Sequence, residues 1–170
     1  MFVTGFFFIL VTALVKYMGP LLPAAEAAFL RYLLGLVFLL PIARTLLATR
    51  ISSRDLKFFA ARGLVHTLAV ILWFYAMTQI PIAEVTAMNY LNPVYVTLGA
   101  AIFLGETLAL RRILAVVAAL LGVVVILRPG FREIETGHLA MLATAALFGA
   151  SYLFAKPLSG RYSATMVVAM

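Results

Sequence analysis

The most constraining feature of the chain is an apolar run at residues 83–104 whose middle is polar. The run is long enough to cross a bilayer, which takes about 20 residues in a helix. Asn89, Tyr90, Asn92 and Pro93 lie near its centre. An unpaired polar group in lipid is costly, so such residues normally face protein or a water-filled cavity. Because Pro93 also removes a backbone donor, the segment predicts a broken membrane helix.

Two interpretations of this polar centre stay open. Many transporters build a substrate site from interrupted helices at the middle of the membrane, which would place the segment on a transport pathway. Proline and asparagine also occur in membrane helices purely for kinking and for hydrogen bonding between helices.

Composition places the rest of the chain in the same class. Of the 170 residues, 65% are hydrophobic and 11% are charged, whereas soluble domains carry about 25% charged residues. Further apolar runs cover residues 2–18, 24–43, 58–79, 113–127 and 138–155, and another begins at residue 163. We therefore expect an all-α integral membrane protein, a multi-helix bundle in the lipid bilayer with about six spans plus the start of a seventh.

The basic residues predict the orientation of the bundle. The net charge is +7, but the positive charges lie in short loops between apolar runs, which indicates membrane topology and no nucleic-acid partner. One side carries eight of them, and the other carries Lys16, Arg128 and Arg132. The eight are Arg44, Arg50, Arg54, Lys57, Arg111, Arg112, Lys156 and Arg161. The N-terminus is therefore expected in the cytoplasm, in a multi-pass protein of the cell membrane, taken to be a bacterial inner membrane.

Polar residues within the spans are candidates for binding. Arg31 lies seven residues into its span, at a depth of roughly 10 Å. It either contacts an anionic substrate, pairs with Glu26 or Glu84, or extends its side chain to the membrane surface. The candidate substrate contacts are Arg31, Tyr32, His66, Asn89, Tyr90, Asn92, Pro93 and Tyr95. Glu84 and His66 are candidates for carrying a coupling proton, although a lone histidine such as His66 can also be purely structural.

The sequence argues against an enzyme. It contains no cysteine and no HExxH motif, its one aspartate is expected in a loop, and its histidines are isolated along the chain. No catalytic residue, metal site or cofactor is therefore expected. Because the last apolar run stops at Met170, the chain is interpreted as a fragment of a longer protein. The alternative to a transporter is a non-transporting membrane fragment or scaffold that needs its missing half or a partner copy, for instance as a homodimer.

Several short motifs resemble those of EamA-type transporters in the drug/metabolite transporter superfamily. They are Lys16-Tyr17-Met18-Gly19, Phe29-Leu30-Arg31-Tyr32, residues 81–87, Asn92-Pro93, Phe103-Leu104-Gly105-Glu106, and Leu121-Gly122 through Arg128-Pro129-Gly130. The resemblance implies inverted five-helix repeats around a central cavity, the first at residues 1–130 and a truncated second at residues 137–170. Residues 12–16 and 152–156, which are weakly alike at an offset of 140, agree with such a repeat.

The same resemblance implies what the protein does. It implies a transporter or facilitator that moves small-molecule substrates, metabolites or drugs, by alternating access. It gives Gly105 and Glu106 a structural role, in which Glu106 closes a turn against Arg111 or Arg112.

Overall fold

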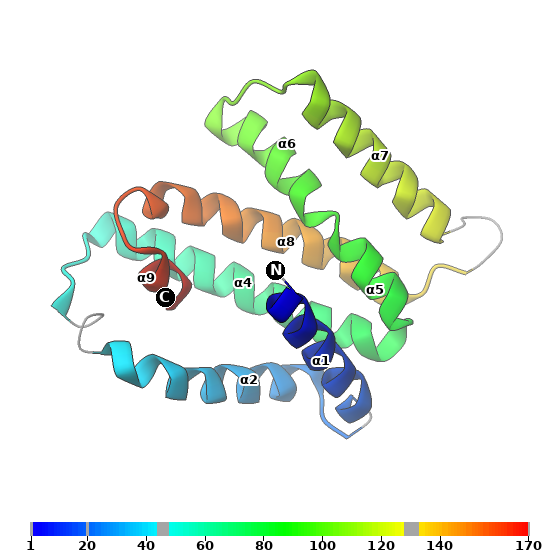
Figure 1. The fold of residues 1–170 in the computed structure, drawn as a ribbon, viewed down its shortest axis with the longest axis horizontal. Helices are drawn as coiled ribbons and strands as arrows, with labels where there is room; N and C mark the ends of the chain where they lie inside the picture. The colour runs from blue at the N-terminus through cyan, green and yellow to red at the C-terminus, as the bar shows by residue number, and fades with distance from the viewer. Residues whose placement is uncertain (1, 20, 44–47, 128–132, 170) are drawn as a thin grey trace.

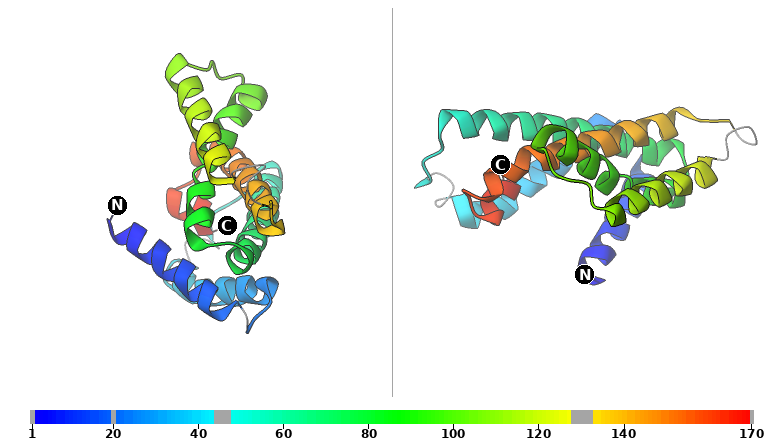
Figure 2. Two further views of the ribbon diagram at one scale, coloured as in Figure 1. Left: turned by 90° about the vertical axis from the view of Figure 1, so that its right-hand side faces the viewer. Right: turned by 90° about the horizontal axis from the view of Figure 1, so that it is seen from above.

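The computed structural model describes residues 2–19, 21–43, 48–127 and 133–169, and the regular structure in these ranges is helical, as expected. The helices are α1 (Phe2–Met18), α2 (Ala24–Leu39), the 3-10 helix η1 (Leu40–Ile42), α4 (Ser53–Gln79), α5 (Ile82–Asn89), α6 (Asn92–Leu104), α7 (Leu110–Leu127), α8 (Thr136–Ser159) and α9 (Ala164–Ala169) (Figure 1). The pair α4–α8 lies in the middle, with α1 and α2 on one side and α6 and α7 on the other (Figure 2).

Three helical segments among the described residues are long and apolar enough to cross a membrane. They are Ser53–Gln79, Ile82–Leu104 and Thr136–Ser159. Much of the apolar surface that the bundle leaves exposed lies on α2 and α7, for example Leu34 at 64% and Val125 at 67% exposure. Water would penalise such a surface, whereas lipid accepts it.

The antiparallel pair α4–α8 forms the centre of the bundle. Three hydrogen bonds join the two helices along their length: Tyr75 to Thr136 at 3.0 Å, Thr144 to the Ala69 carbonyl at 3.5 Å, and Ser151 to His66 at 3.4 Å. The residues buried between and beside the two helices include the small side chains of Ala69, Ala76, Ala140 and Ala145. Small residues allow two membrane helices to approach closely, so packing and hydrogen bonding act together in this pair.

The predicted break in the fourth apolar run is confirmed. Helix α5 ends at Asn89 and α6 begins at Asn92, with Tyr90 and Leu91 in a turn between them. The amides of Tyr90 and Leu91 bond the carbonyls three residues earlier, so the backbone tightens immediately before Pro93. The run then ends at Gly105, whose φ of 66° is left-handed and therefore favours glycine.

Several predicted helix ends were wrong by a few residues. Helix α4 begins at Ser53, five residues before the apolar run, so Asp55 lies in a first helical turn and not in a loop. Helix α7 begins at Leu110, which places Arg111 and Arg112 in its first turn. Helix α8 continues through Pro157 to Ser159. Apolarity marks the part of a helix that lies in lipid, whereas polar first turns and a proline near the end extend beyond it.

Polar contacts tie the helices together at each end of the bundle. At one end the buried Asp55 carboxylate accepts hydrogen bonds from Arg161 at 2.6 Å and Tyr162 at 2.9 Å, which joins the start of α4 to the segment after α8. Burial and the bond to Asp55 raise the pKa of the Tyr162 hydroxyl, so it keeps its proton and donates. At the other end the Lys16 ammonium donates to the Ile80 carbonyl at 3.0 Å, which joins α1 to the end of α4.

Candidate functional site

A group of polar side chains lies where α2, α4 and α8 meet, and we call it the α2–α4–α8 cluster. Its members are Arg31 and Tyr32 from α2, Arg62 and His66 from α4, and Ser151 and Tyr152 from α8. The Arg31 guanidinium carbon lies 5.6 Å from the centre of the Tyr32 ring, a cation–π geometry. Both tyrosine hydroxyls are electrostatic neighbours of the Arg62 guanidinium. Three apolar helices thus bring charged and hydroxyl groups to one place.

A cavity of about 450 Å³ adjoins this cluster. Tyr32, His66 and Thr67 are its polar lining, and Val168 and Ala169 of α9 contribute to its wall. Two buried polar atoms of the cluster have no hydrogen-bond partner among the described residues: the Tyr32 hydroxyl and the Arg62 Nε. Leaving a buried polar atom unpaired is costly, so these atoms are suited to contact a ligand.

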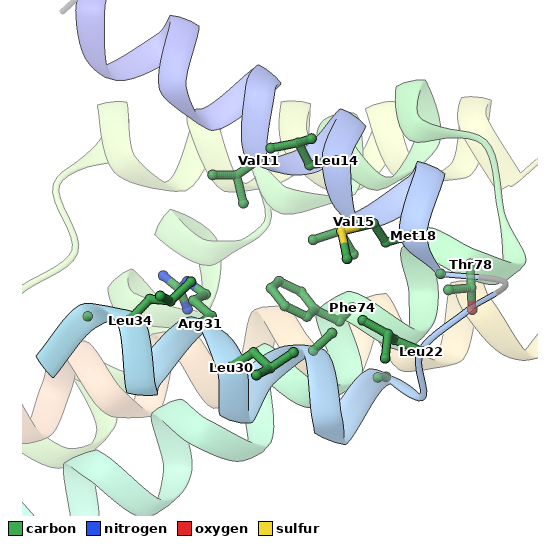
Figure 3. A pocket seen from close by; sticks show the side chains of 14 residues that line it. Val11, Leu14, Val15, Met18, Leu22, Leu30, Arg31, Leu34, Phe74 and Thr78 are labelled. Carbon is green, nitrogen blue, oxygen red and sulfur yellow. The ribbon is translucent and has the colours of Figure 1, made fainter. Parts of the chain in front are cut away.

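Arg31 also lines a second, apolar cavity of about 400 Å³ between α1, α2 and α4. Figure 3 shows its guanidinium at one end of a wall formed by side chains such as Leu34, Val15 and Phe74. The structure gives Arg31 no ion pair with Glu26 or Glu84, since Glu84 is bonded elsewhere and no contact with Glu26 is found in the described part of the chain. Of the three predictions for Arg31, pairing with either acid is therefore wrong.

The asparagine segment forms a separate site. Asn89, Tyr90, Asn92 and Pro93 line an open cavity of about 480 Å³ together with Val96 and Tyr152. The Asn92 amide donates to the Asn89 side chain at 2.9 Å, while the buried Asn92 Oδ1 accepts no hydrogen bond from any residue that the structure describes. Tyr95 instead packs against Gly149 of α8. The candidate substrate contacts are therefore spread over three cavities: Tyr32 and His66 line one, Arg31 lines the apolar one, and the asparagine segment lines the third.

Glu84 forms a buried pair with His138, at 2.8 Å between carboxylate and Nε2. The Nδ1 atom of His138 accepts from the Glu135 backbone N–H at 3.0 Å. A ring nitrogen that accepts carries no proton, so the proton of this imidazole lies on Nε2 and points at Glu84. Both histidines are isolated along the chain, but in the fold each bonds a side chain far away in sequence: His138 bonds Glu84, and His66 bonds Ser151.

The Gly105-Glu106 turn holds α6, α7 and α8 together. Glu106 accepts from Arg112 at 3.2 Å and forms an ion pair with Lys156 at the end of α8. Arg111 is exposed in the first turn of α7. The positive φ of Gly105 turns the chain at the end of α6 and so places Glu106 beside both partners.

Sequence reasoning missed Arg62, Tyr152 and His138 as site residues. A usable signal existed for Arg62, which lies four residues before His66 and therefore on the same helix face. A signal also existed for His138, because Glu135 and His138 have the spacing of a helix capping box, which the structure contains. Tyr152 offered no signal, since its role depends on where α8 packs. The described residues bring together no group of three or more His, Asp or Glu side chains suited to a metal ion.

Comparison with known proteins identifies the family. Residues 1–128 match the model of the EamA-like transporter family. The chain is 27% identical to the pseudopaline exporter CntI of Pseudomonas aeruginosa over 96% of this chain and 58% of the exporter. It is 31% identical to a riboflavin transporter of Rhizobium johnstonii over 81% of this chain and 46% of the relative. It is 25% identical to an S-adenosylmethionine uptake transporter of Rickettsia prowazekii over 78% of this chain and 45% of the relative.

The chain spans about half the length of these curated relatives, between 45% and 58%. No solved structure is significantly similar to it. The match to the family model covers about three quarters of the chain and includes every candidate site residue except His138, Ser151 and Tyr152. Together with its apolar, membrane-length helices, this match shows that the chain is a membrane protein and belongs to the EamA-like transporter family.

Proposed function

We propose that the chain works in a secondary transporter or facilitator that moves a small organic molecule across the cytoplasmic membrane by alternating access. The observation that carries this proposal is the α2–α4–α8 cluster, where the Tyr32 hydroxyl and the Arg62 Nε are buried with no hydrogen-bond partner among the described residues. Tyr32 and His66 of this cluster line a cavity of about 450 Å³. Ligand sites are commonly cavities of about 300–1,000 Å³ with a few polar groups in apolar walls. An apolar cavity with a few polar groups, formed between helices of a membrane protein, is suited to holding a solute in transit.

The relatives support transport over the other functions considered. They are named as transporters of pseudopaline, riboflavin and S-adenosylmethionine. None is named as an enzyme or a scaffold, so neither an intramembrane enzyme nor the alternative of a non-transporting fragment is favoured. The three named cargoes are different small molecules. The relatives therefore support a small-molecule substrate, and which molecule it is depends on the residues of the binding site.

The architecture we propose has six spans and the start of a seventh, with a first repeat at residues 1–130 and the beginning of an inverted second repeat at residues 137–170. In this arrangement α8 opens the second repeat, and the cluster lies where it meets the first. The stretch Arg128-Pro129-Gly130, which would end the first repeat, is outside the described residues. The N-terminus is placed in the cytoplasm and the protein in the bacterial inner membrane, and a homodimer is one candidate assembly.

Coupling to a proton is proposed for Glu84 and His66, as the sequence suggested. The bond from Glu84 to the His138 ring adds His138 to the group that would carry the proton. The pair joins the first turn of α5 to the first turn of α8, so a change in its protonation would act on two helices at once.

The experiment is a flux measurement in proteoliposomes containing the complete protein. The solute panel includes riboflavin, S-adenosylmethionine, amino acids, organic anions, nucleosides and amphipathic cations. Tyr32→Phe, which removes one buried hydroxyl, is expected to reduce flux of the transported solute about tenfold, the effect of a lost hydrogen bond of roughly 1.5 kcal/mol. Tyr17→Phe is the matched control, because Tyr17 is 80% exposed at the end of α1.

A second variant tests the same cavity in the same assay. His66→Gln is expected to reduce flux as well, since His66 lines the same cavity as Tyr32. Unchanged flux in both Tyr32→Phe and His66→Gln, in protein that remains folded, would remove the cavity from the transport path.

A further inference from the structure

We infer that the α2–α4–α8 cluster binds the negatively charged group of its ligand, a carboxylate or a phosphate, between Arg62 and Arg31. The inference rests on the proposed function and adds the chemical class of the substrate, an organic anion.

The first observation is the state of Arg62. Its side chain is half buried, and its Nε is fully buried with no hydrogen-bond partner in the part of the chain that the structure describes. Arg62 lies four residues past Phe58, where the apolar part of α4 begins, roughly 6 Å along the helix. A guanidinium has five N–H donors and remains charged, so where it is buried among apolar helices it needs acceptors to be stable.

The second observation is the surplus of positive charge. The Arg31 guanidinium lies over the Tyr32 ring, and Arg62 lies four residues before His66, on the same face of α4. Tyr32 and His66 line one cavity, so each arginine lies next to a residue of that cavity. The ion pairs found among the described residues include neither Arg31 nor Arg62.

The third observation is that the acids of the chain lie elsewhere. The sequence holds six, and all six are within the described residues. Four are engaged: Asp55 with Arg161, Glu84 with His138, Glu106 with Arg112 and Lys156, and Glu135 in the cap of α8. Glu26 and Glu133 are exposed, and Glu26 is five residues before Arg31, which turns it about 140° away around the helix. The acids of this chain therefore do not balance the charge of Arg62, and we assign that role to the ligand.

The remaining groups complete a site for an anion. The unpartnered Tyr32 hydroxyl can donate to an oxygen held by Arg62, and Arg31 lies over the same tyrosine ring. Guanidinium groups bind carboxylates and phosphates through two parallel hydrogen bonds, which neutral or cationic ligands cannot accept in this way. The cavity lined by Tyr32 and His66 then leaves room for the rest of the molecule.

The test compares four probes that share one ring and differ in charge. Benzoate and phenyl phosphate are anionic, benzamide is neutral and benzylamine is cationic. Binding is measured as thermal stabilisation of the complete protein in phosphatidylcholine nanodiscs, as a function of probe concentration. We expect the two anions to bind most tightly, and Arg62→Gln to weaken them about 10- to 100-fold. Arg62→Lys, which keeps the charge but loses the fork, should lie between the two.

Arg54→Gln is the matched control, since Arg54 is an exposed arginine at the start of the same helix. It should leave binding of all four probes unchanged. If Arg62→Gln fails to fold, Arg31→Gln and Arg62→Lys make the same comparison. Equal binding of benzamide and benzoate, or anion binding that none of the Arg62 and Arg31 variants weakens, would overturn the inference.

Two further measurements distinguish the anion site from the proposed transport function and from lipid binding. Flux of neutral solutes with no preference for anions would overturn the anion site and leave the proposed transport standing. Anion binding that depends on Arg62, without flux of any solute, would support the site and overturn transport. Adding phosphatidylglycerol to the nanodiscs tests a lipid headgroup as the anion: if it abolishes benzoate binding in competition, the site belongs to lipid and the assignment to a soluble substrate fails.

Discussion

His138 is fixed by hydrogen bonds on both sides of its ring. The side chain is 2% exposed, its Nδ1 accepts from the Glu135 amide, and its Nε2 donates to Glu84. The partner Glu84 is 16% exposed. A buried donor that loses its only acceptor carries the full cost of desolvation, so this pair should matter for stability.

Comparing two replacements of Glu84 should distinguish the stability contributed by its hydrogen bond to His138 from the stability contributed by its charge. Glu84→Ala should lower the free energy of unfolding by about 1–3 kcal/mol, because the His138 N–H is left unsatisfied. Glu84→Gln should cost less, since its amide oxygen still accepts from Nε2. Thermal denaturation in one detergent, followed for both variants and the parent, measures the difference. Equal losses for alanine and glutamine would show that the bond to His138 does not stabilise the fold.

The sequence allowed single residues to be chosen as candidate site residues, but it did not predict which residues they contact. Apolar context alone selected Arg31, His66 and Glu84, because a charged or titratable group within a membrane run is unusual. The contact of Glu84 with His138 joins residues 54 positions apart, and it depends on how α5 meets α8. Arg62 was predictable only as a neighbour of His66, since its burial depends on α2 and α8 covering that face of α4.

At the scale of the helices, Gly149 of α8 allows the backbone of α6 to approach closely. A Cβ atom placed on Gly149 would lie 2.7 Å from the Cβ of Tyr95 and 3.4 Å from backbone atoms of α6. Neither neighbour is the free end of a flexible side chain, so the two helices would have to separate. Gly122 of α7 is the opposite case, because a Cβ there meets no atom within 4 Å.

Gly149→Ala should accordingly destabilise the protein by about 1–3 kcal/mol, the usual cost of overpacking a tight contact. Gly122→Ala serves as the control and should leave stability unchanged or slightly raised, since alanine is the better helix former. Thermal denaturation of both variants checks the prediction. If Gly149→Ala melts with the parent, α6 does not pack on α8 as closely as the structure has it.

Helices were easier to predict from the sequence than their ends. Most of each apolar run that the sequence marked is helical where the structure describes it, and the polar centre around Asn89–Pro93 correctly located the break between α5 and α6. The ends at Ser53, Leu110 and Ser159 were missed, because polar residues there are held by contacts outside the apolar run. Asp55 is an example, because this residue of the first turn of α4 accepts hydrogen bonds from Arg161 and Tyr162, which follow the end of α8.

For the whole molecule, the ends of the helices form two groups. Asp55 with Arg161, and Glu106 with Lys156, join the start of α4, the α6–α7 turn and the end of α8. Lys16 with Ile80, and Glu84 with His138, join the ends of α1 and α4 to the starts of α5 and α8. The first group contains seven described basic residues, namely Arg50, Arg54, Lys57, Arg111, Arg112, Lys156 and Arg161, and the second contains Lys16. Arg44, Arg128 and Arg132 lie outside the described residues.

This asymmetry predicts which end of the bundle faces the cytoplasm. Basic loops are retained on the cytoplasmic side, so the end with Glu106 should be inside and the end with His138 outside. The chain has no cysteine, so one introduced thiol per variant reports a single position. Thr107→Cys and Ile134→Cys suit the test, because both residues are exposed and they lie beyond opposite ends of α7.

In right-side-out membrane vesicles, an impermeant maleimide should label Ile134→Cys at once and Thr107→Cys only after permeabilisation. Both variants should label equally in detergent, which controls for the reactivity of each thiol. The reverse pattern would invert the proposed orientation and place the N-terminus outside. Labelling of both positions from one side would mean that α7 does not cross the membrane, which would contradict the proposal of six spans.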